Sequence, residues 1–551
     1  MDLQSPFIYL AVCAFLVMVV ANVRRIHMET YGKWSIVVLA AMVSVSIIFL
    51  WIPLHIALIV LWMYREIIRA YLKLKHGSEF FGIIGGSDVL YLTGDHEKNA
   101  MSILMIVESN AEDIYEIYKS VVDRSFFANP SKFPELHCVV RQFGGYFYKV
   151  KASPTVEECV KKMEEVSCEG DKISKDEFKQ LMNKCCNEKL PKGNTLFWDS
   201  YIGVQPLDWN SEPNSSARHY PVVFRLHHAI GDGFVATQLL SILVDRIPYE
   251  SQDPMHTYLN KVKSDPPLAI IFHKIAVTLY AIVYSISAIL LYLLNKGSNN
   301  PMQGSKRSNV DVITMKVDKG DSVRRIKQIK STVGHTGFAN ILLTAISATL
   351  QQYFEFHAKC PERINVIVPF LRKAASLSKI PLGQLDASDI SFHNNFILLI
   401  LGLPLIVGDN HDVSLTKRLE AVNKAIANSS KSATNTIMYF WSHIGIQVLP
   451  IPMFGQVNDA PQSSAILSVL PGPGQASLAD GRMPIRNVMS WIPLAGGVGM
   501  SMCVITYNEG LNVTLRVDKE IISDEKVAQS ILNGIFEKLD LFEKELKIKS
   551  D

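Results

Sequence analysis

The sequence is short of the features that identify several large classes of protein. Its 551 residues carry a net charge of +3 and no long block of one sign, so nothing indicates a nucleic-acid partner. Its eight cysteines form no C-x-x-C pair and no cysteine–histidine spacing suited to zinc, which favours reduced, mostly buried thiols that face the cytosol. No internal repeat is visible. The chain is nevertheless too long for one ordinary core, so we expect two or more lobes.

Apolar residues, by contrast, are concentrated in three runs, which raise the mean hydropathy to +0.16. The first two runs, 7–20 and 34–64, are each followed by basic side chains, and the second exceeds the ~20 residues that span a bilayer. Asp2 is the only charged side chain before the first run, and no small-residue cleavage site follows the run. We therefore interpret both runs as a membrane anchor and not as a signal peptide. The positive flanks favour two passes or a shallow hairpin, with the rest of the chain in the cytosol. We therefore predict a membrane protein of the endoplasmic reticulum or, alternatively, of the plasma membrane.

The third run, 267–294, is also long enough to cross a bilayer. A single crossing would place the parts of the chain before and after it on opposite sides of the membrane. If those parts form one site, the run must lie in the interface or dip in and return, with His273 and Lys274 at head-group level. The alternative is a buried helix between the lobes.

From Gly77 onward the pattern is that of an α/β protein, in which strands and helices alternate. We divide the chain into an N-terminal membrane anchor (1–76), an N-terminal lobe (77–250), an apolar interlobe linker (251–305) and a C-terminal lobe (306–551). We predict strands at 102–108, 136–150 (a pair that turns at Gly144-Gly145), 195–204, 221–226, 312–317, 364–370, 396–404, 465–470, 489–505 and 511–517, and helices at 110–124, 175–188, 322–330, 339–354, 414–427 and, after an Asp524 cap, up to 546.

The stretch with the clearest chemical content is 220–247. An apolar, β-branched strand leads into the loop His227-His228-Ala229-Ile230-Gly231-Asp232-Gly233, and a helix with one apolar face follows. Such a junction of strand end and helix N-terminus is where α/β proteins often carry their chemistry. The alternative is a plain turn, in which the glycines supply backbone freedom and Asp232 caps the helix.

A neutral imidazole in this loop is able to take a proton from a hydroxyl group as the oxygen attacks. Adjacent side chains at a strand end point in opposite directions, so only one of the two histidines is able to face a given cleft. A zinc site would need both to converge, and we therefore predict no metal. The first N–H groups of the following helix are available to stabilise a developing oxyanion.

The motif His227-His228-x-x-x-Asp232-Gly233 resembles the signature of coenzyme A-dependent acyltransferases with the chloramphenicol-acetyltransferase-like fold. More of the chain, about 77–545, resembles one branch, the wax ester synthase/diacylglycerol acyltransferase family, in its membrane-anchored eukaryotic form. The further matching segments follow in the expected order: Leu190-Pro191, Leu196 to Gly203, Asn340, Val368-Pro369 with Arg372, Asn394-Asn395-Phe396, Leu403-Pro404-Leu405, Ser468 with Pro471-Gly472-Pro473, Thr506 to Leu511, and Asp518.

This resemblance implies two α/β lobes with a tunnel between them, and a reaction that transfers a fatty acyl group from acyl-CoA to a lipophilic alcohol. His228 would be the general base and Gly233 the oxyanion donor, with Asp232 more a brace of the loop than a proton acceptor. The supporting positions that the resemblance implies are His227 and Gly231. The substrate-binding positions that it implies are Asn340, Asn394 and Ser468. Helix-cap and turn roles remain open for Asn340 and Asn394.

Acyl-CoA is then a co-substrate, no cofactor is bound, and the lipid bilayer is a partner that supplies the alcohol or diacylglycerol. A sterol, retinol or amine acceptor is an alternative within the same class. Three departures from the family pattern, Val469 for Asn, Ile341 for Asp and Ser102 for His, motivate a further alternative, a membrane-bound lipid carrier or scaffold without turnover.

Overall fold

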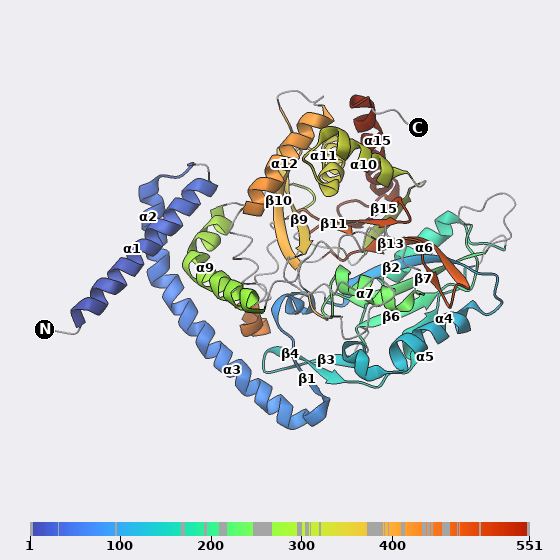
Figure 1. Cartoon of the computed structure of the whole chain (residues 1–551), viewed down its shortest axis with the longest axis horizontal. Coiled ribbons are helices and arrows are strands. Elements are labelled where there is room, and N and C mark those ends of the chain that lie inside the picture. The colour runs from blue at the N-terminus through green and yellow to red at the C-terminus, as the bar shows by residue number, and fades with distance from the viewer. Residues whose placement is uncertain are drawn as a thin grey trace.

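Two six-stranded sheets form the centre of the protein, and four apolar helical segments lie to one side of it (Figure 1). The computed structural model describes residues 4–30, 32–93, 96–166, 171–191, 196–208, 218–245, 267–294, 300–303, 308, 310–318, 321–371, 390, 392–394, 396–408, 414–431, 437, 441, 445–453, 463–470, 472, 474–494 and 498–547.

The sheet of the N-terminal lobe has the order β12-β13-β2-β7-β6-β5. Its strands are β2 (Ala100–Glu108), β5 (Val160–Lys162), β6 (Trp198–Ile202), β7 (His219–His227), β12 (Ser477–Leu478) and β13 (Met483–Trp491). Helices α4 (Ile114–Val122), α5 (Val156–Cys159), α6 (Lys175–Asn187) and α7 (Gly233–Leu243) accompany it. The strand β7 is buried along its whole length, because α4 and α7 pack on one face of the sheet and α6 on the other. The last residues of β7 therefore lie in the interior of the protein.

The sheet of the C-terminal lobe has the order β10-β9-β11-β14-β15-β8. Its strands are β8 (Asp311–Val317), β9 (Arg363–Leu371), β10 (Phe396–Pro404), β11 (Ala465–Leu470), β14 (Met500–Tyr507) and β15 (Gly510–Asp518). Its helices are α10 (Ser322–Val333), α11 (Phe338–His357), α12 (Leu415–Lys431) and α15 (Glu525–Glu545), and all four contribute to one core with the sheet. Asp524 caps α15 by accepting a hydrogen bond from the backbone N–H of Lys526 at 2.8 Å, as predicted.

A small third sheet, β1 (Phe80–Ile83), β4 (Tyr146–Lys151) and β3 (Cys138–Phe143), joins the N-terminal lobe to the anchor. The predicted hairpin is present: Gly144 and Gly145 have φ angles of 58° and 82°, which glycine adopts without steric cost.

One predicted strand, 489–505, is two strands in the structure, and they belong to different sheets. β13 pairs antiparallel with β2 of the N-terminal lobe, whereas β14 pairs with β11 and β15 of the C-terminal lobe. The segment 477–491, which the sequence analysis assigned to the C-terminal lobe, therefore completes the N-terminal sheet. The sheet of the N-terminal lobe thus includes β12 and β13 from the C-terminal half of the chain. Both lobes must therefore lie on the same side of any membrane.

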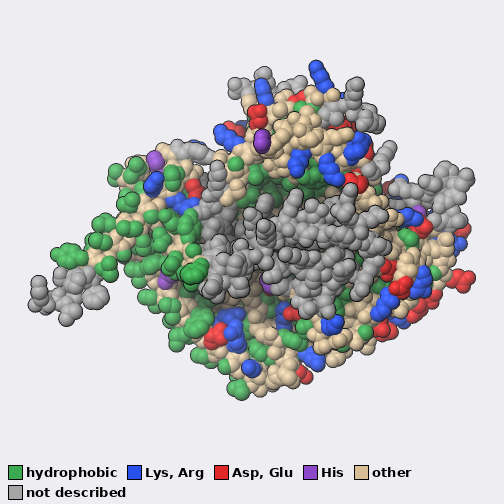
Figure 2. Space-filling view, viewed as in Figure 1, with side chains coloured by type: hydrophobic (Ala, Val, Ile, Leu, Met, Phe, Trp, Pro, Cys, Tyr) green, Lys and Arg blue, Asp and Glu red, His purple; other side chains and the backbone are tan. Residues whose placement is uncertain are grey.

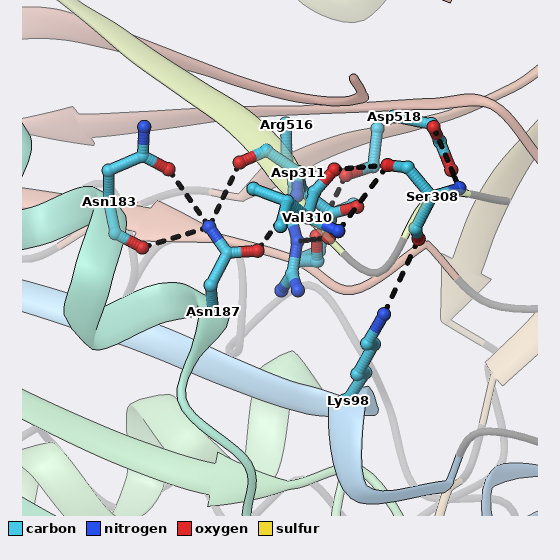
Figure 3. Close-up of polar contacts among 10 residues, drawn as sticks. Lys98, Asn183, Asn187, Ser308, Val310, Asp311, Arg516 and Asp518 are labelled. Carbon is cyan, nitrogen blue, oxygen red and sulfur yellow. Dashed lines mark hydrogen bonds and ion pairs between the residues drawn. The ribbon is translucent and has the colours of Figure 1, made fainter. Parts of the chain in front are cut away.

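A buried polar network also holds the lobes together (Figure 3). Asn187, at the end of α6, bonds both backbone groups of Asp311 on β8, at 2.9 and 2.8 Å. The Asp311 carboxylate in turn accepts from Nε of Arg516 on β15 at 2.6 Å, and both side chains are almost fully buried. Removing one member would leave a buried charge or amide unpaired, so this network favours one fixed arrangement of the lobes.

The N-terminal helices are α1 (Gln4–Glu29), α2 (Ile36–Ser46) and α3 (Ile52–His76), with a π-helical turn (Ile47–Trp51) between the last two. Two helical segments, Ile8–Glu29 and Ile36–Glu79, are long and apolar enough to cross a membrane, as predicted. Figure 2 shows hydrophobic side chains gathered over these helices. The C-terminal part of α3 instead packs Ile68 and Leu72 against the small third sheet, so the N-terminal helices continue directly into the N-terminal lobe.

The third apolar run forms α9 (Pro267–Leu294), beside α1 and α2 (Figure 1). Ile286, Leu290 and Leu291 of α9 lie in one buried cluster with side chains of α1 and α2, so this part of α9 packs on the N-terminal helices. Asn22 of α1 donates to Val283 O at 2.9 Å and accepts from Ser287 N–H at 2.9 Å. These two groups would bond each other in a regular helix, so the Asn22 amide inserts into the hydrogen-bond ladder of α9. The side chains of His273 and Lys274 lie outside the described residues.

Candidate active site

The histidine motif lies where β7 ends and α7 begins, as the sequence predicts. The carboxylate of Asp232 accepts hydrogen bonds from the backbone N–H groups of Phe234 and Val235, both at 3.0 Å. It therefore satisfies two of the N–H groups that the first turn of a helix leaves unpaired. A Cβ atom at Gly231 would lie 2.5 Å from Cγ1 of Val235, so this position has no room for a side chain. These contacts give Asp232 and Gly231 the task of shaping the loop.

The two histidines have different surroundings, as expected for neighbours at a strand end. His227 is fully buried in the N-terminal lobe, edge-on to the ring of Phe197 with centroids 4.7 Å apart. Its Nδ1 accepts a hydrogen bond from Ala229 N–H at 3.1 Å. His227 is thus part of the turn itself.

His228 faces the junction with the C-terminal lobe. Its backbone N–H donates to Asn99 O at 2.8 Å, which fixes the loop to the start of β2. The ring of Tyr91 stacks on the imidazole, with centroids 4.0 Å apart and planes 7° from parallel. Phe396, at the start of β10, meets the imidazole edge-on at 6.0 Å. The Nδ1 atom of His228 lies 2.8 Å from Oδ1 of Asn394, so residues from both lobes hold this ring.

Asn394 is itself held by an acidic side chain of the N-terminal lobe. Its backbone N–H and its Nδ2 both donate to Oδ1 of Asp88, at 2.9 and 2.7 Å. Nδ2 also donates to His228 O at 2.6 Å, and Ser87 Oγ donates to Asn394 O at 3.2 Å. Since Nδ2 faces two acceptors, Oδ1 must face the imidazole. An amide oxygen only accepts, so Nδ1 of His228 carries the proton and Nε2 holds the lone pair of a base.

Burial governs the ionisation of this cluster. Burial lowers the pKa of His228 to about 4, against the hydrogen bond to Asn394, which acts in the other direction. Burial also raises the pKa of Asp88 to about 6, although its hydrogen bonds from Asn394 oppose the rise. The pKa of Tyr91 is raised by burial and by the carboxylates of Asp232 and Asp88. At neutral pH the imidazole is therefore neutral and the Asp88 carboxylate is mostly ionised.

Gly233, the first residue of α7, is more accessible than Gly231 and Asp232. A Cβ atom at this position would lie 3.3 Å from Cδ1 of Leu470 on β11, so the helix N-terminus also borders the C-terminal lobe. The Asp232 cap occupies the next two N–H groups, which leaves the Gly233 N–H as the donor that is able to face an oxyanion.

The three predicted substrate-binding residues have different surroundings in the structure. Asn394 is brought to His228, as described above. Asn340, in the first turn of α11, donates to Oδ1 of Asn423 on α12 at 2.6 Å. Ser468 is a buried residue of β11 that lies opposite Cys503 on β14. The structure thus directs Asn340 and Ser468 to partners within their own lobe, and their predicted contact with substrate stays a prediction.

The departures from the family pattern have local explanations. Ile341 is fully buried in the core of the C-terminal lobe, and Val469 packs against that core. Ser102 is buried on β2, opposite the buried Arg225 of β7. The motif residues Arg372, Asn395, Pro471 and Pro473 lie outside the described residues.

Sequence reasoning missed Asp88, Tyr91 and Asn99. Asp88 and Tyr91 lie in a 3₁₀ segment, Gly86–Leu92, which has no strand or helix periodicity. The clue in the sequence was an aspartate inside an apolar stretch, Gly86-Ser87-Asp88-Val89-Leu90-Tyr91-Leu92, because a buried carboxylate needs a partner.

The arrangement is suited to proton abstraction by a neutral imidazole beside a helix N-terminus. Within the described parts of the chain no group of three or more histidine, cysteine or acidic side chains is placed to hold a metal ion. A base and a backbone N–H donor that lie side by side are able to act together in a reaction that develops negative charge on an oxygen atom.

Comparison with solved structures shows the fold. The wax ester synthase/diacylglycerol acyltransferase from Marinobacter aquaeolei VT8 is 12% identical, with a TM-score of 0.53 over 85% of this chain and 100% of that chain. The trichothecene 15-O-acetyltransferase from Fusarium sporotrichioides is 12% identical, with a TM-score of 0.54 over 84% and 94%. The first condensation domain of the CDA synthetase is 11% identical, with a TM-score of 0.53 over 84% and 96%. The predicted two-lobed, chloramphenicol-acetyltransferase-like α/β fold is confirmed.

Sequence comparison locates the family in the C-terminal half. No curated protein sequence matches the chain, but residues 393–541 match the family model of the WS/DGAT C-terminal domain. This segment begins one residue before Asn394 and contains β10 to β15 and most of α15. Residues 393–541 are therefore similar to the WS/DGAT C-terminal domain, which agrees with the family resemblance drawn from the histidine motif.

Proposed function

We propose that this protein is an acyl-CoA-dependent O-acyltransferase that esterifies a lipophilic alcohol, either a fatty alcohol or a diacylglycerol, in a membrane. The observation that carries the proposal is the His228–Asn394 hydrogen bond of 2.8 Å between the lobes. It joins the histidine motif to the WS/DGAT C-terminal domain and leaves Nε2 as the proton acceptor.

In the proposed reaction, Nε2 of His228 removes the hydroxyl proton of the alcohol as its oxygen attacks the thioester carbonyl. The tetrahedral intermediate places its negative charge near the Gly233 N–H, at the positive end of α7. Collapse breaks the carbon–sulfur bond, and the imidazolium returns the proton to the departing coenzyme A thiolate. The ester, free coenzyme A and a neutral His228 result, so the cycle needs neither a metal nor a bound cofactor.

The low pKa of His228, about 4, matters for this cycle. The ring is in its basic form at any physiological pH, but the imidazolium is costly in a buried site. Asn394 Oδ1 and, behind it, the Asp88 carboxylate would stabilise that cation while it exists, because the amide oxygen presents its negative dipole end and the carboxylate its charge on the Nδ1 side of the ring.

We further propose that α1 and the long α2–α3 segment hold the protein in the bilayer, with both lobes on the cytosolic side, as in the endoplasmic reticulum. The 22 residues of Ile8–Glu29 would reach about 33 Å at 1.5 Å per residue, close to the ~30 Å thickness of a hydrocarbon core. Exposed apolar side chains such as Val37, Phe49 and Ile59 support this assignment. The alcohol would then enter from the lipid and acyl-CoA from the cytosol.

The test is ester formation in cells that lack neutral-lipid synthesis. We expect the full-length protein to produce new wax esters or triacylglycerol, detected by mass spectrometry, and His228→Ala to lower the rate by about 10² to 10⁴-fold. His357→Ala, a substitution of an exposed histidine at the end of α11, is the matched control and should keep full activity.

Supplying sterol or retinol in the same cells separates the alternative acceptors. If no neutral ester of any acceptor accumulates while the His228→Ala protein keeps the cellular role of the natural protein, the chain is a lipid-binding scaffold and the proposal is wrong.

A further inference from the structure

The orientation of the buried Asn394 amide favours one of the two tautomers of His228. If the Asn394 side chain rotated by 180°, Nδ2 would face Nδ1 of His228, and Nδ1 would have to accept. The proton would then reside on Nε2, and the nitrogen that faces the reaction would no longer be a base. A plain asparagine has little intrinsic preference between these two orientations, so something else must select one of them.

We propose that Asp88 is a positioning residue, which selects the amide orientation of Asn394 and thereby keeps His228 in the tautomer with a basic Nε2. The inference rests on the proposed function for its kinetic consequences, but the tautomer is a property of the folded protein alone.

The geometry makes the selection strong. In the observed orientation Nδ2 of Asn394 donates to Asp88 Oδ1 at 2.7 Å and to His228 O at 2.6 Å. Rotation would place the amide oxygen against both of these acceptors and would break both bonds. The Asp88 carboxylate also accepts a hydrogen bond from the backbone N–H of Asn394 at 2.9 Å. This bond does not depend on the side-chain amide, so it holds the carboxylate in place during any such rotation.

The interaction also spans the two lobes. Asp88 and Asn394 are 306 residues apart in the chain, and the 3₁₀ segment that carries Asp88 also carries Tyr91, whose ring stacks on His228. The base is therefore set in its tautomer only where the lobes meet in this arrangement, so activity is coupled to correct assembly of the two lobes.

Protonation of Asp88 would weaken the selection, because a neutral carboxyl group has an O–H that is able to donate to a rotated amide oxygen. The other charged or titratable groups that face Asp88 are Lys149 on β4 and His393, while Tyr91 lies beside it. Burial raises the pKa of Asp88 to about 6 and lowers the pKa of His228 to about 4. An acidic fall in kcat near pH 6 would thus report Asp88 and not the base.

The decisive variant is Asp88→Asn, which keeps the shape but replaces the carboxylate with a neutral amide that is able to donate as well as accept. Using the full-length protein in detergent, with palmitoyl-CoA, hexadecanol and a thiol reagent for released coenzyme A, we expect kcat at pH 8 to fall at least about tenfold. KM for palmitoyl-CoA should change less than about twofold, and the acidic fall near pH 6 should disappear. His393→Gln should retain that fall, and Asp480→Asn, an exposed carboxylate change, should leave both kcat and its pH profile unchanged.

A second readout does not depend on turnover. In ¹⁵N-histidine NMR spectra, with His228 assigned by difference from His228→Ala, the natural protein should show the Nδ1–H tautomer and Asp88→Asn a mixture of both tautomers. A single Nδ1–H tautomer in Asp88→Asn, or an unchanged kcat and acidic fall in an active enzyme, would overturn the inference. The expected tautomers in a protein that forms no ester would support the positioning role and refute the proposed function alone.

Discussion

Replacing Asp88 with asparagine should change how the stability of the protein depends on pH. Burial raises the pKa of this carboxyl group from its ordinary 3.8 to about 6, so the folded protein binds the proton more tightly than the unfolded chain does. The protonated group therefore favours folding below about pH 3.8, and this contribution is lost as the pH rises through about 6. Asparagine does not titrate, so the folding stability of the variant does not change with pH through this position.

The magnitude follows from the pKa. A rise from 3.8 to about 6 corresponds to about 3 kcal/mol over the whole range, of which roughly 1–2 kcal/mol falls between pH 5 and pH 7.5. Relative to the natural protein, Asp88→Asn should thus become more stable by this amount on going from pH 5 to pH 7.5. For a chain of 551 residues, this is a relative gain of about 1–2 °C in Tm in a thermal unfolding experiment.

The assay is thermal unfolding of the full-length proteins in one detergent at several pH values, followed by intrinsic fluorescence. Asp480→Asn is the control, since the exposed Asp480 carboxylate should give a Tm difference that does not vary with pH. A constant Tm difference between Asp88→Asn and the natural protein from pH 5 to pH 7.5 would refute the assignment of a buried, weakly acidic carboxyl group at this position.

Three further predictions concern the loop and its lobe. Asp232→Ala should lower the free energy of unfolding by about 1 kcal/mol, because the cap of α7 is lost. In steady-state kinetics the same variant should show a clear fall in kcat and a smaller change in KM. Gly231→Ala should lower activity at least about tenfold, since the added Cβ meets Val235 at 2.5 Å; restored activity in a Val235→Ala background would locate the cause in that clash. Asp199→Ala should destabilise the N-terminal lobe by about 3–5 kcal/mol, because it leaves the buried Arg225 guanidinium without its 2.6 Å partner; denaturation and expression yield would check this.

Much of the fold was predictable because its elements are locally patterned. The strand β7, the cap at Asp232, the helix α11 and the C-terminal helix after Asp524 all lie where apolar periodicity and capping residues indicate. The main correction, the assignment of β13 to the N-terminal sheet, involves a strand whose own pattern is ordinary. Its partner β2 lies far earlier in the chain, and pairing over such a distance is decided by the packing of the two lobes.

The site divides in the same way. The histidine motif was found because its residues are consecutive and chemically distinctive, and Asn394 because it falls within an ordered family pattern. Asp88 and Tyr91 belong to an irregular 3₁₀ segment, so no period or motif marked them. Their roles arise only from contacts with Asn394 and His228, which lie far away in the chain.

The sequence by itself determined the apolar anchor, the strand–loop–helix that carries the two histidines, and the cap that shapes the loop, since each depends on residues within a few turns of one another. The tertiary structure decided which lobe receives β13, where α9 packs, and which nitrogen of His228 is basic. These features depend on single hydrogen bonds and strand pairs between distant residues, whose energies become favourable only after the lobes have come together.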